Sequence, residues 1–85
     1  MNAIAVTRSL FSEKYGRFRR LLIKARKEAG LTQVALAQKL SRPQSYVSKY
    51  ERGERRLDVI EFFEVAQAMR IDPFNVLRTL NLLDK

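Results

Sequence analysis

Apolar residues recur every three or four positions through the first third of the chain, which is the period of one face of an α-helix. This stripe consists of Phe11, Tyr15, Phe18, Leu22, Ala25 and Ala29. Basic side chains fall mostly on the other side, where we expect a solvated face made of Arg17, Arg19, Arg20, Lys24 and Lys27. Ser9 or Ser12 is suited to begin this helix, and Gly30 is suited to end it. Residues 1–12 are then an N-terminal arm or a helix extension, in which only residues 4–6 suit a short extended segment.

Two short helices are predicted next, separated by a tight turn. Thr32 is a good N-cap for a helix over residues 33–40. Pro43 suits the first turn of a helix that runs to about residue 51 or 52, because its missing N–H has no helical partner there. Gly53 then ends this helix. The pattern predicts a helix-turn-helix over about residues 32–52.

Two further helices complete the predicted domain, which spans residues 13–85. Asp58 and Glu61 have the spacing of a capping box, which begins a helix that continues to about residue 70. Asp72 followed by Pro73 reads as an N-cap and a first helical residue, so the C-terminal helix and tail cover about residues 72–85. No segment alternates with a period of two for long enough to form a sheet. The predicted fold is all-α, a compact bundle of five helices.

The amino-acid composition excludes most kinds of catalytic site. The 85 residues contain no Cys, His or Trp, which excludes thiolate and imidazole metal sites and Ser-His-Asp triads. No glycine-rich loop is present that would hold a phosphate-bearing cofactor. We expect no enzyme activity, no metal and no cofactor. Neither a secretory signal nor a stretch of the roughly 20 apolar residues that a membrane span needs is present, so we expect a cytoplasmic protein without membrane contact.

The basic charge lies in the first two thirds of the chain. Lys and Arg number 17 against 9 Asp and Glu, a net charge of +8. Residues 1–30 hold eight basic and two acidic side chains, residues 31–57 hold six and two, and residues 58–85 hold three and five. This distribution predicts that residues 1–57 bind a polyanion and that residues 58–85 form a packing or pairing segment of the same domain.

The predicted helix over residues 43–52 is polar on one side. At 100° per residue, an arc of about 140° contains no acid, and its members are Gln44, Ser45, Ser48, Lys49 and Arg52. The opposite arc holds Tyr46, Val47, Tyr50 and, at its edge, Glu51. Gln can bond adenine, Lys can reach guanine, and Ser can donate or accept in the major groove. We therefore predict base contacts from Gln44, Ser45, Ser48 and Lys49.

Glu51 and Arg26 each stand on or near an apolar face, where an unpaired charge is costly. Arg26 lies close to Leu22 on the apolar stripe of the first helix. A buried ion pair between Arg26 and Glu51 would give each charge a partner, and we expect it to join the first helix to the third.

These motifs resemble the phage repressor/Cro-type helix-turn-helix domains of bacteria and their viruses. The resemblance covers about residues 16–80 and rests on Ala29-Gly30-Leu31-Thr32-Gln33, Leu36-Ala37 and Val47-Ser48-Lys49-Tyr50-Glu51-Arg52-Gly53. It implies a five-helix DNA-binding domain that usually binds as a dimer, a phosphate contact from Gln33, and the Arg26–Glu51 bridge. The chain departs from the family in the turn, where Ser41 replaces a common Gly and Arg42 a common apolar residue.

Further phosphate contacts are expected around the helix-turn-helix, from Arg42 in the turn and from Arg52, Arg55 and Arg56 after the third helix. Tyr46 is ambiguous, since it either packs at the helix edge or touches a phosphate or a thymine methyl. The apolar residues near the C-terminus exceed what one short helix needs for a single core. We expect a dimer interface made of Phe74, Leu77, Leu80, Leu82 and Leu83.

The function that these features favour is a sequence-specific regulator of transcription that binds double-stranded DNA. A dimeric repressor would place its two third helices in successive major grooves, about 34 Å apart. Two alternatives within this class are an antitoxin with a small protein partner and a controller of a restriction–modification operon. An alternative of another class is a protein-interaction module that uses the same scaffold without DNA.

Overall fold

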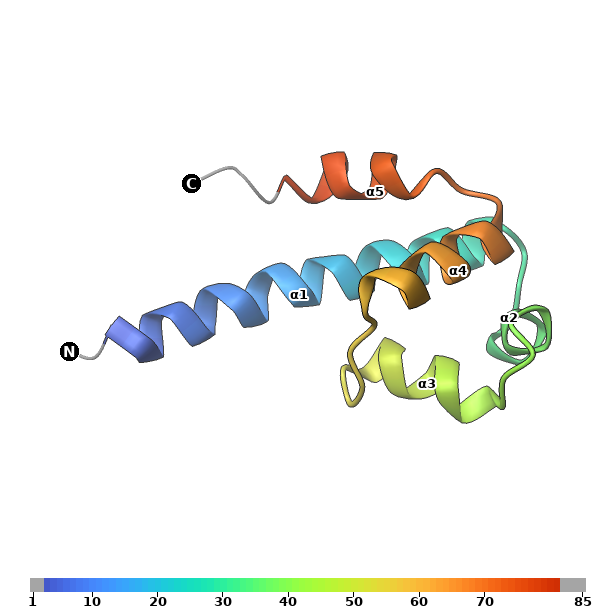
Figure 1. The fold of residues 1–85 in the computed structure, drawn as a ribbon, viewed down its shortest axis with the longest axis horizontal. Helices are drawn as coiled ribbons and strands as arrows, with labels where there is room; N and C mark the ends of the chain where they lie inside the picture. Colours follow the sequence, from blue (N-terminus) through green and yellow to red (C-terminus); the bar gives the residue numbers. More distant parts are fainter. Residues whose placement is uncertain (1–2, 82–85) are drawn as a thin grey trace.

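The computed structural model describes the backbone of residues 3–81 and the side chains of residues 13–81. Within that range the chain forms five helices and no strand, which confirms the all-α prediction (Figure 1). The helices are α1 (Ala3–Glu28), α2 (Gln33–Lys39), α3 (Gln44–Arg52), α4 (Val59–Met69) and α5 (Pro73–Leu80). None of the described helices has the length and apolar character needed to cross a membrane.

Helix α1 continues through Ser9 and Ser12, so of the two alternatives for residues 1–12 the structure shows the helix extension from Ala3 onward. It begins at Ala3 and runs without interruption to Glu28. Residues 4–6 are therefore helical, and the alternative of a short extended arm there is wrong. The sequence between residues 3 and 28 contains no Pro, and its single Gly16 does not stop a helix of this length. Figure 1 shows the first turns of α1 reaching beyond α3 and α4.

Capping side chains begin three of the short helices, as the sequence predicts. The side chains of Thr32, Asp58 and Asp72 each accept a backbone N–H from the first turn of their helix. The side chain of Glu61 in turn accepts a hydrogen bond from the backbone N–H of Asp58, which completes the capping box. Satisfying these otherwise unpaired N–H groups sets where each helix begins.

Helix α3 differs from its prediction by one residue at its start. Pro43 is the N-cap, in an extended conformation, and the first helical residue is Gln44. The fixed φ of proline fits either position, so the sequence alone did not separate them. At the other end Gly53 adopts φ 80°, a left-handed conformation, and ends the helix as predicted.

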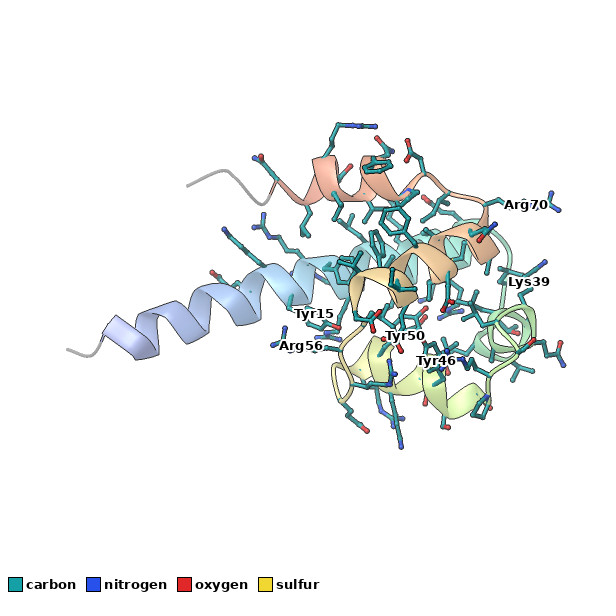
Figure 2. The ribbon with its side chains drawn as sticks, viewed as in Figure 1. Tyr15, Lys39, Tyr46, Tyr50, Arg56 and Arg70 are labelled. Carbon is teal, nitrogen blue, oxygen red and sulfur yellow. The ribbon has the colours of Figure 1, made fainter. Side chains whose placement is uncertain are left out.

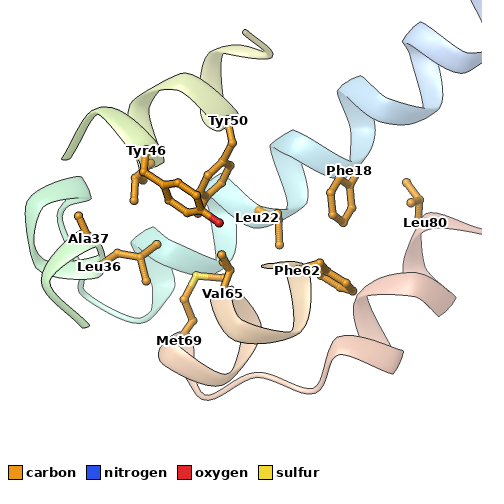
Figure 3. Packing of buried hydrophobic residues seen from close by; sticks show 11 residues of the cluster. Phe18, Leu22, Leu36, Ala37, Tyr46, Tyr50, Phe62, Val65, Met69 and Leu80 are labelled. Carbon is orange, nitrogen blue, oxygen red and sulfur yellow. The ribbon is translucent and has the colours of Figure 1, made fainter. Parts of the chain in front are cut away.

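The hydrophobic core lies where all five helices meet. Figure 3 shows Leu22 of α1, Leu36 of α2, Tyr50 of α3 and Val65 of α4 converging on it. Helix α2 packs on α3, and α1 packs on both α3 and α5. Leu80 of α5 is only 4% exposed and closes this core. Its side chain is thus already buried within the molecule, which leaves little of its surface for the predicted dimer interface.

Candidate nucleic-acid interface

The polar arc of α3 faces outward, because the opposite side of the helix is anchored in the core. Val47 and Tyr50 are buried, which fixes the rotation of the helix about its own axis. Gln44, Ser45 and Lys49 are then exposed, and Ser48 is partly exposed. The structure thus brings the four predicted base-contacting residues together on one surface. Figure 1 shows α3 on the outside of the molecule, beside α2.

The turn between α2 and α3 is built around Ser41. This residue adopts φ 55°, in the left-handed region where Gly is most easily accommodated. Its N–H donates to the carbonyl of Gln38 (3.1 Å), and the N–H of Arg42 donates to that of Ala37 (3.0 Å). These bonds close the end of α2 and turn the chain sharply into α3. The turn keeps the geometry that Gly would favour, although Ser occupies the position.

Arg26 and Glu51 form a buried, two-pronged ion pair between α1 and α3. Arg26 Nε lies 2.7 Å from Glu51 Oε2, and its Nη2 lies 3.1 Å from Oε1. Arg26 Nη1 also donates to the carbonyl of Leu31 (2.9 Å), just before α2. One guanidinium therefore holds both helices of the helix-turn-helix against α1. Such a pair supplies orientation more surely than net stability, because both charges lose water.

A chain of hydrogen bonds leads from this buried pair to the exposed polar arc of α3. The amide nitrogen of Gln33 donates to Glu51 Oε1 (2.8 Å), which turns the amide oxygen of Gln33 outward. That oxygen accepts a longer hydrogen bond from the amide nitrogen of Gln44 (3.4 Å). The predicted phosphate contact, Gln33, and the predicted base contact, Gln44, are thus neighbours across the start of α2 and the start of α3. Nothing in the sequence pattern indicated this link.

Arg19 has a role that the sequence analysis missed. Its Nη1 donates to the backbone carbonyl of Glu51, in the last turn of α3. Its guanidinium also covers Gly53, where an added Cβ would lie 3.1 Å from Arg19 Nε. A cation that bonds a terminal carbonyl stabilises a helix C-terminus. Arg19 therefore caps α3 instead of standing on a solvated face, and no local signal in the sequence distinguishes it from Arg17 or Arg20.

Tyr46 belongs to the core, where its ring meets that of Tyr50 edge-on with centroids 5.9 Å apart (Figure 3). It is 7% exposed, which agrees with the packing alternative and leaves little surface for a phosphate. The guanidinium carbons of Arg42 and Arg55 lie 4.7 and 4.6 Å from its ring centroid, within reach of a cation–π interaction. Burial raises the pKa of the Tyr46 hydroxyl above its ordinary value.

Three arginines at the end of α3 and in the loop after it were predicted to contact phosphates. Arg55 pairs with Glu61 through two bonds of 2.6 and 3.2 Å, and the Arg55 guanidinium is the main cause that lowers the pKa of Glu61 to about 2. Arg52 pairs with Glu54, with Nε 2.7 Å from Oε2. Arg56 lies over the ring of Tyr15, 4.3 Å from its centroid (Figure 2). Two of the three arginines therefore already have a carboxylate partner.

Large apolar side chains are exposed on α4 and α5. Ile60 and Phe63 on α4 and Phe74 on α5 all belong to this group. The rings of Phe63 and Phe74 meet edge-on, with centroids 5.6 Å apart. Of the remaining residues predicted for a dimer interface, Leu77 is partly buried, whereas Leu82 and Leu83 lie outside the described residues.

Comparison with known proteins agrees with this architecture. The family model for helix-turn-helix domains matches residues 22–74. An XRE-family like protein from Pseudomonas syringae pv. tomato str. DC3000 is 42% identical, with a TM-score of 0.88, over 94% of this chain and 98% of that chain. The restriction-modification controller protein C.AhdI from Aeromonas hydrophila is 31% identical, with a TM-score of 0.67, over 73% of this chain and 94% of that chain. No curated protein matches the chain.

The family match covers more than half of the chain, and its 22–74 range includes the whole of α2, α3 and α4. The exposed polar arc of α3 and the buried Arg26–Glu51 pair both lie inside that range. The chain therefore belongs to the XRE, or phage repressor/Cro-type, family of helix-turn-helix proteins and is a DNA-binding transcriptional regulator, not an enzyme.

Proposed function

We propose that this regulator is a homodimeric repressor that reads a specific DNA sequence with α3 in the major groove. The observation that carries the proposal is the polar arc of α3, whose candidate base-contacting members are Gln44, Ser45, Ser48 and Lys49. These side chains offer amide, hydroxyl and ammonium groups for base edges. The arc contains no acidic residue that would repel DNA, and Val47 and Tyr50 hold it rigidly toward solvent.

Phosphate contacts beside the groove would come from both ends of the helix-turn-helix. Gln33 is partly exposed beside Gln44, and Arg42 is exposed in the turn. Arg52 at the end of α3 and Arg56 in the loop after it are exposed, while Arg55 is more firmly held by Glu61 and Tyr46. Contacts to phosphate fix the register of the protein on the duplex, whereas α3 supplies the sequence preference.

The homodimer would form through the exposed apolar residues of α4 and α5, namely Ile60, Phe63 and Phe74, together with Leu77. Soluble monomers rarely expose a large contiguous apolar patch. A two-fold axis through such a patch lets two copies of α3 enter successive major grooves, about 34 Å apart.

Selection of bound sites from random DNA tests the sequence preference. We expect an inverted repeat whose half-sites are one helical turn apart. Gln44→Ala should cost roughly 1–3 kcal/mol of binding free energy at one base pair in each half-site and relax the preference there. Gln67→Ala is a matched control, since Gln67 is an exposed glutamine on α4. Equal losses on the selected site and on random DNA would assign Gln44 to the DNA backbone instead.

Sedimentation equilibrium tests the dimer. Phe74→Glu should shift the protein to monomer and weaken binding to the full inverted repeat more than binding to one half-site, because it places a charge in the apolar contact. Asn75→Glu is the control, since Asn75 is exposed on the same helix. A wild-type protein that stays monomeric at high concentration would contradict the dimer.

A second candidate is a controller of a restriction–modification operon. The similarity to the controller protein from Aeromonas hydrophila favours it, at 31% identity over most of both chains. This reading predicts that the selected site occurs in the promoter of the chain's own gene and of a methyltransferase gene. No observation favours the antitoxin or the protein-interaction module over these two.

A further inference from the structure

One carboxylate interrupts the basic surface around α3. Residues 31–57 contain two acids, Glu51 and Glu54, and Glu51 is buried in its pair with Arg26. Glu54 is therefore the exposed acid of this segment, and it follows α3 by two residues. Its backbone N–H donates to the carbonyl of Lys49 (2.9 Å), which fixes it beside the last turn of α3. A negative charge at this edge opposes the approach of DNA phosphates.

The carboxylate of Glu54 is bonded to Arg52, a residue of the polar arc. Arg52 Nε lies 2.7 Å from Oε2 and Nη2 lies 3.2 Å from Oε1. The guanidinium edge that binds a carboxylate through two N–H groups can also bind a phosphate. Two of the nitrogen atoms that Arg52 would offer to a phosphate are thus already bonded to Glu54 in the free protein.

The exposure of this pair distinguishes it from the neighbouring pair of Arg55 and Glu61. The side chains of Arg52 and Glu54 are 58% and 53% exposed, whereas those of Arg55 and Glu61 are 37% and 15% exposed. Glu61 is held a second time by the backbone N–H of Asp58 (3.0 Å). The Arg55–Glu61 pair is therefore part of the fold. An exposed pair such as Arg52–Glu54 is weak, and an external anion can open it.

We propose that Glu54 competes with DNA for Arg52 within the protein itself. In the free protein the carboxylate occupies the guanidinium, and a backbone phosphate displaces it when the protein binds DNA. This inference rests on the proposed DNA contact of the α3 surface. Phosphate prevails because each contact with DNA also releases a condensed counterion, which the contact with Glu54 does not. Glu54 thereby lowers the affinity of the regulator for DNA.

Measurement of DNA affinity with Glu54→Gln tests the competition, using the DNA site selected from random sequences as the probe. Glutamine has the same shape without the charge, and we expect binding to tighten about two- to five-fold, the range typical for one exposed ion pair. Glu28→Gln is the matched control, because Glu28 is an exposed acid paired with Lys24 on α1 (3.8 Å) and the variant has the same net charge. Equal tightening by both variants would overturn the proposal.

The Arg52→Ala background separates competition from simple charge repulsion. Arg52→Ala alone should weaken binding and reduce the salt slope by about 0.9, the value for one phosphate contact. In that background Glu54→Gln should tighten binding no more than Glu28→Gln does. The proposal would be overturned if Glu54→Gln still tightened binding fully in the Arg52→Ala background. An unchanged salt slope in Arg52→Ala would overturn it as well. If the wild-type protein binds no duplex DNA at all, the proposed function fails instead.

The carboxyl carbon of Glu54 gives a readout that does not depend on affinity. In the free protein its hydrogen bond with Arg52 is the main cause that lowers the pKa of Glu54 below its ordinary value. NMR titration of the carboxyl carbon should show this pKa rising when the selected duplex is added, since Arg52 leaves for a phosphate. A pKa that stays low in the saturated complex would show that the pair never opens, which contradicts displacement.

Discussion

At the scale of single residues, Tyr50 shows how completely α3 is anchored. Its side chain is among the largest that are fully buried, and it points from α3 into the core (Figure 3). Its hydroxyl has no hydrogen-bond partner among the described residues. Burial is the main cause that raises the pKa of this hydroxyl above its ordinary value. The ring, and not the hydroxyl, therefore stabilises the fold.

We predict that Tyr50→Phe leaves the free energy of unfolding unchanged or raises it by up to about 1 kcal/mol, because it removes a buried polar group and keeps the ring. Tyr50→Ala should cost about 3–5 kcal/mol, the usual loss for a large aromatic side chain in a core. Urea denaturation measures both changes. A loss of more than about 1 kcal/mol in Tyr50→Phe would mean that the hydroxyl is bonded in solution.

The Arg26–Glu51 pair leads to a second prediction at this scale. Arg26→Met should lower the free energy of unfolding by about 3–5 kcal/mol, because it leaves the carboxylate of Glu51 buried without its cation. Combining Arg26→Met with Glu51→Leu should recover much of that loss. Denaturation of the single and double variants measures the coupling between the two residues. Additive losses would contradict a strong buried pair.

At the scale of helices and turns, two residues in the left-handed conformation flank α3. Ser41 has φ 55° before it, and Gly53 has φ 80° after it. We predict that Ser41→Gly stabilises the protein by up to about 1 kcal/mol, because glycine adopts this conformation without steric cost. Gly53→Ala should destabilise it, both through its φ and because the new Cβ would lie 3.1 Å from Arg19 Nε. Thermal unfolding measures both, and opposite signs are the expected result.

The capping box of α4 should make stability depend on pH. Arg55, and next the backbone of Asp58, lower the pKa of Glu61 from 4.5 to about 2. A lowered pKa in the folded state means that the contribution of Glu61 is complete above about pH 4.5 and disappears as the pH falls toward 2. Glu61→Gln keeps the capping bonds but removes this titration. Urea denaturation from pH 6 to pH 2 should therefore give a flatter profile for Glu61→Gln than for the wild-type protein.

At the scale of the whole molecule, the net charge of +8 is the sum of +10 over residues 1–57, which include α1, α2 and α3, and −2 over residues 58–85. We predict that the logarithm of DNA affinity falls linearly with the logarithm of salt concentration, at about −0.9 for each phosphate contacted. Titrations of the selected duplex between low and physiological salt measure this slope. A flat response would contradict a phosphate-contacting surface.

Local signals account for most of the fold that the sequence predicted. Thr32, Asp58 and Asp72 marked three helix starts, because a capping side chain bonds N–H groups only two or three residues away. Ser9 and Ser12 look like caps, but a helix can continue through them, so the sequence left open whether residues 1–12 extend the first helix or form an arm. The start of α3 was predicted one residue too early, because the φ of Pro43 suits both the N-cap and the first helical position.

The sequence by itself determined the helices and the outward polar arc of α3, because caps and a period of 3.6 residues depend only on neighbours along the chain. Only the tertiary structure decided which partners the side chains meet. It placed Arg19 on the end of α3, joined Gln33 to Gln44 and buried Leu80, while leaving Ile60 and Phe63 exposed. These outcomes depend on how helices far apart in the sequence pack together. Local sequence therefore determines the chemistry of the polar arc of α3, whereas the contacts that orient this arc depend on tertiary packing.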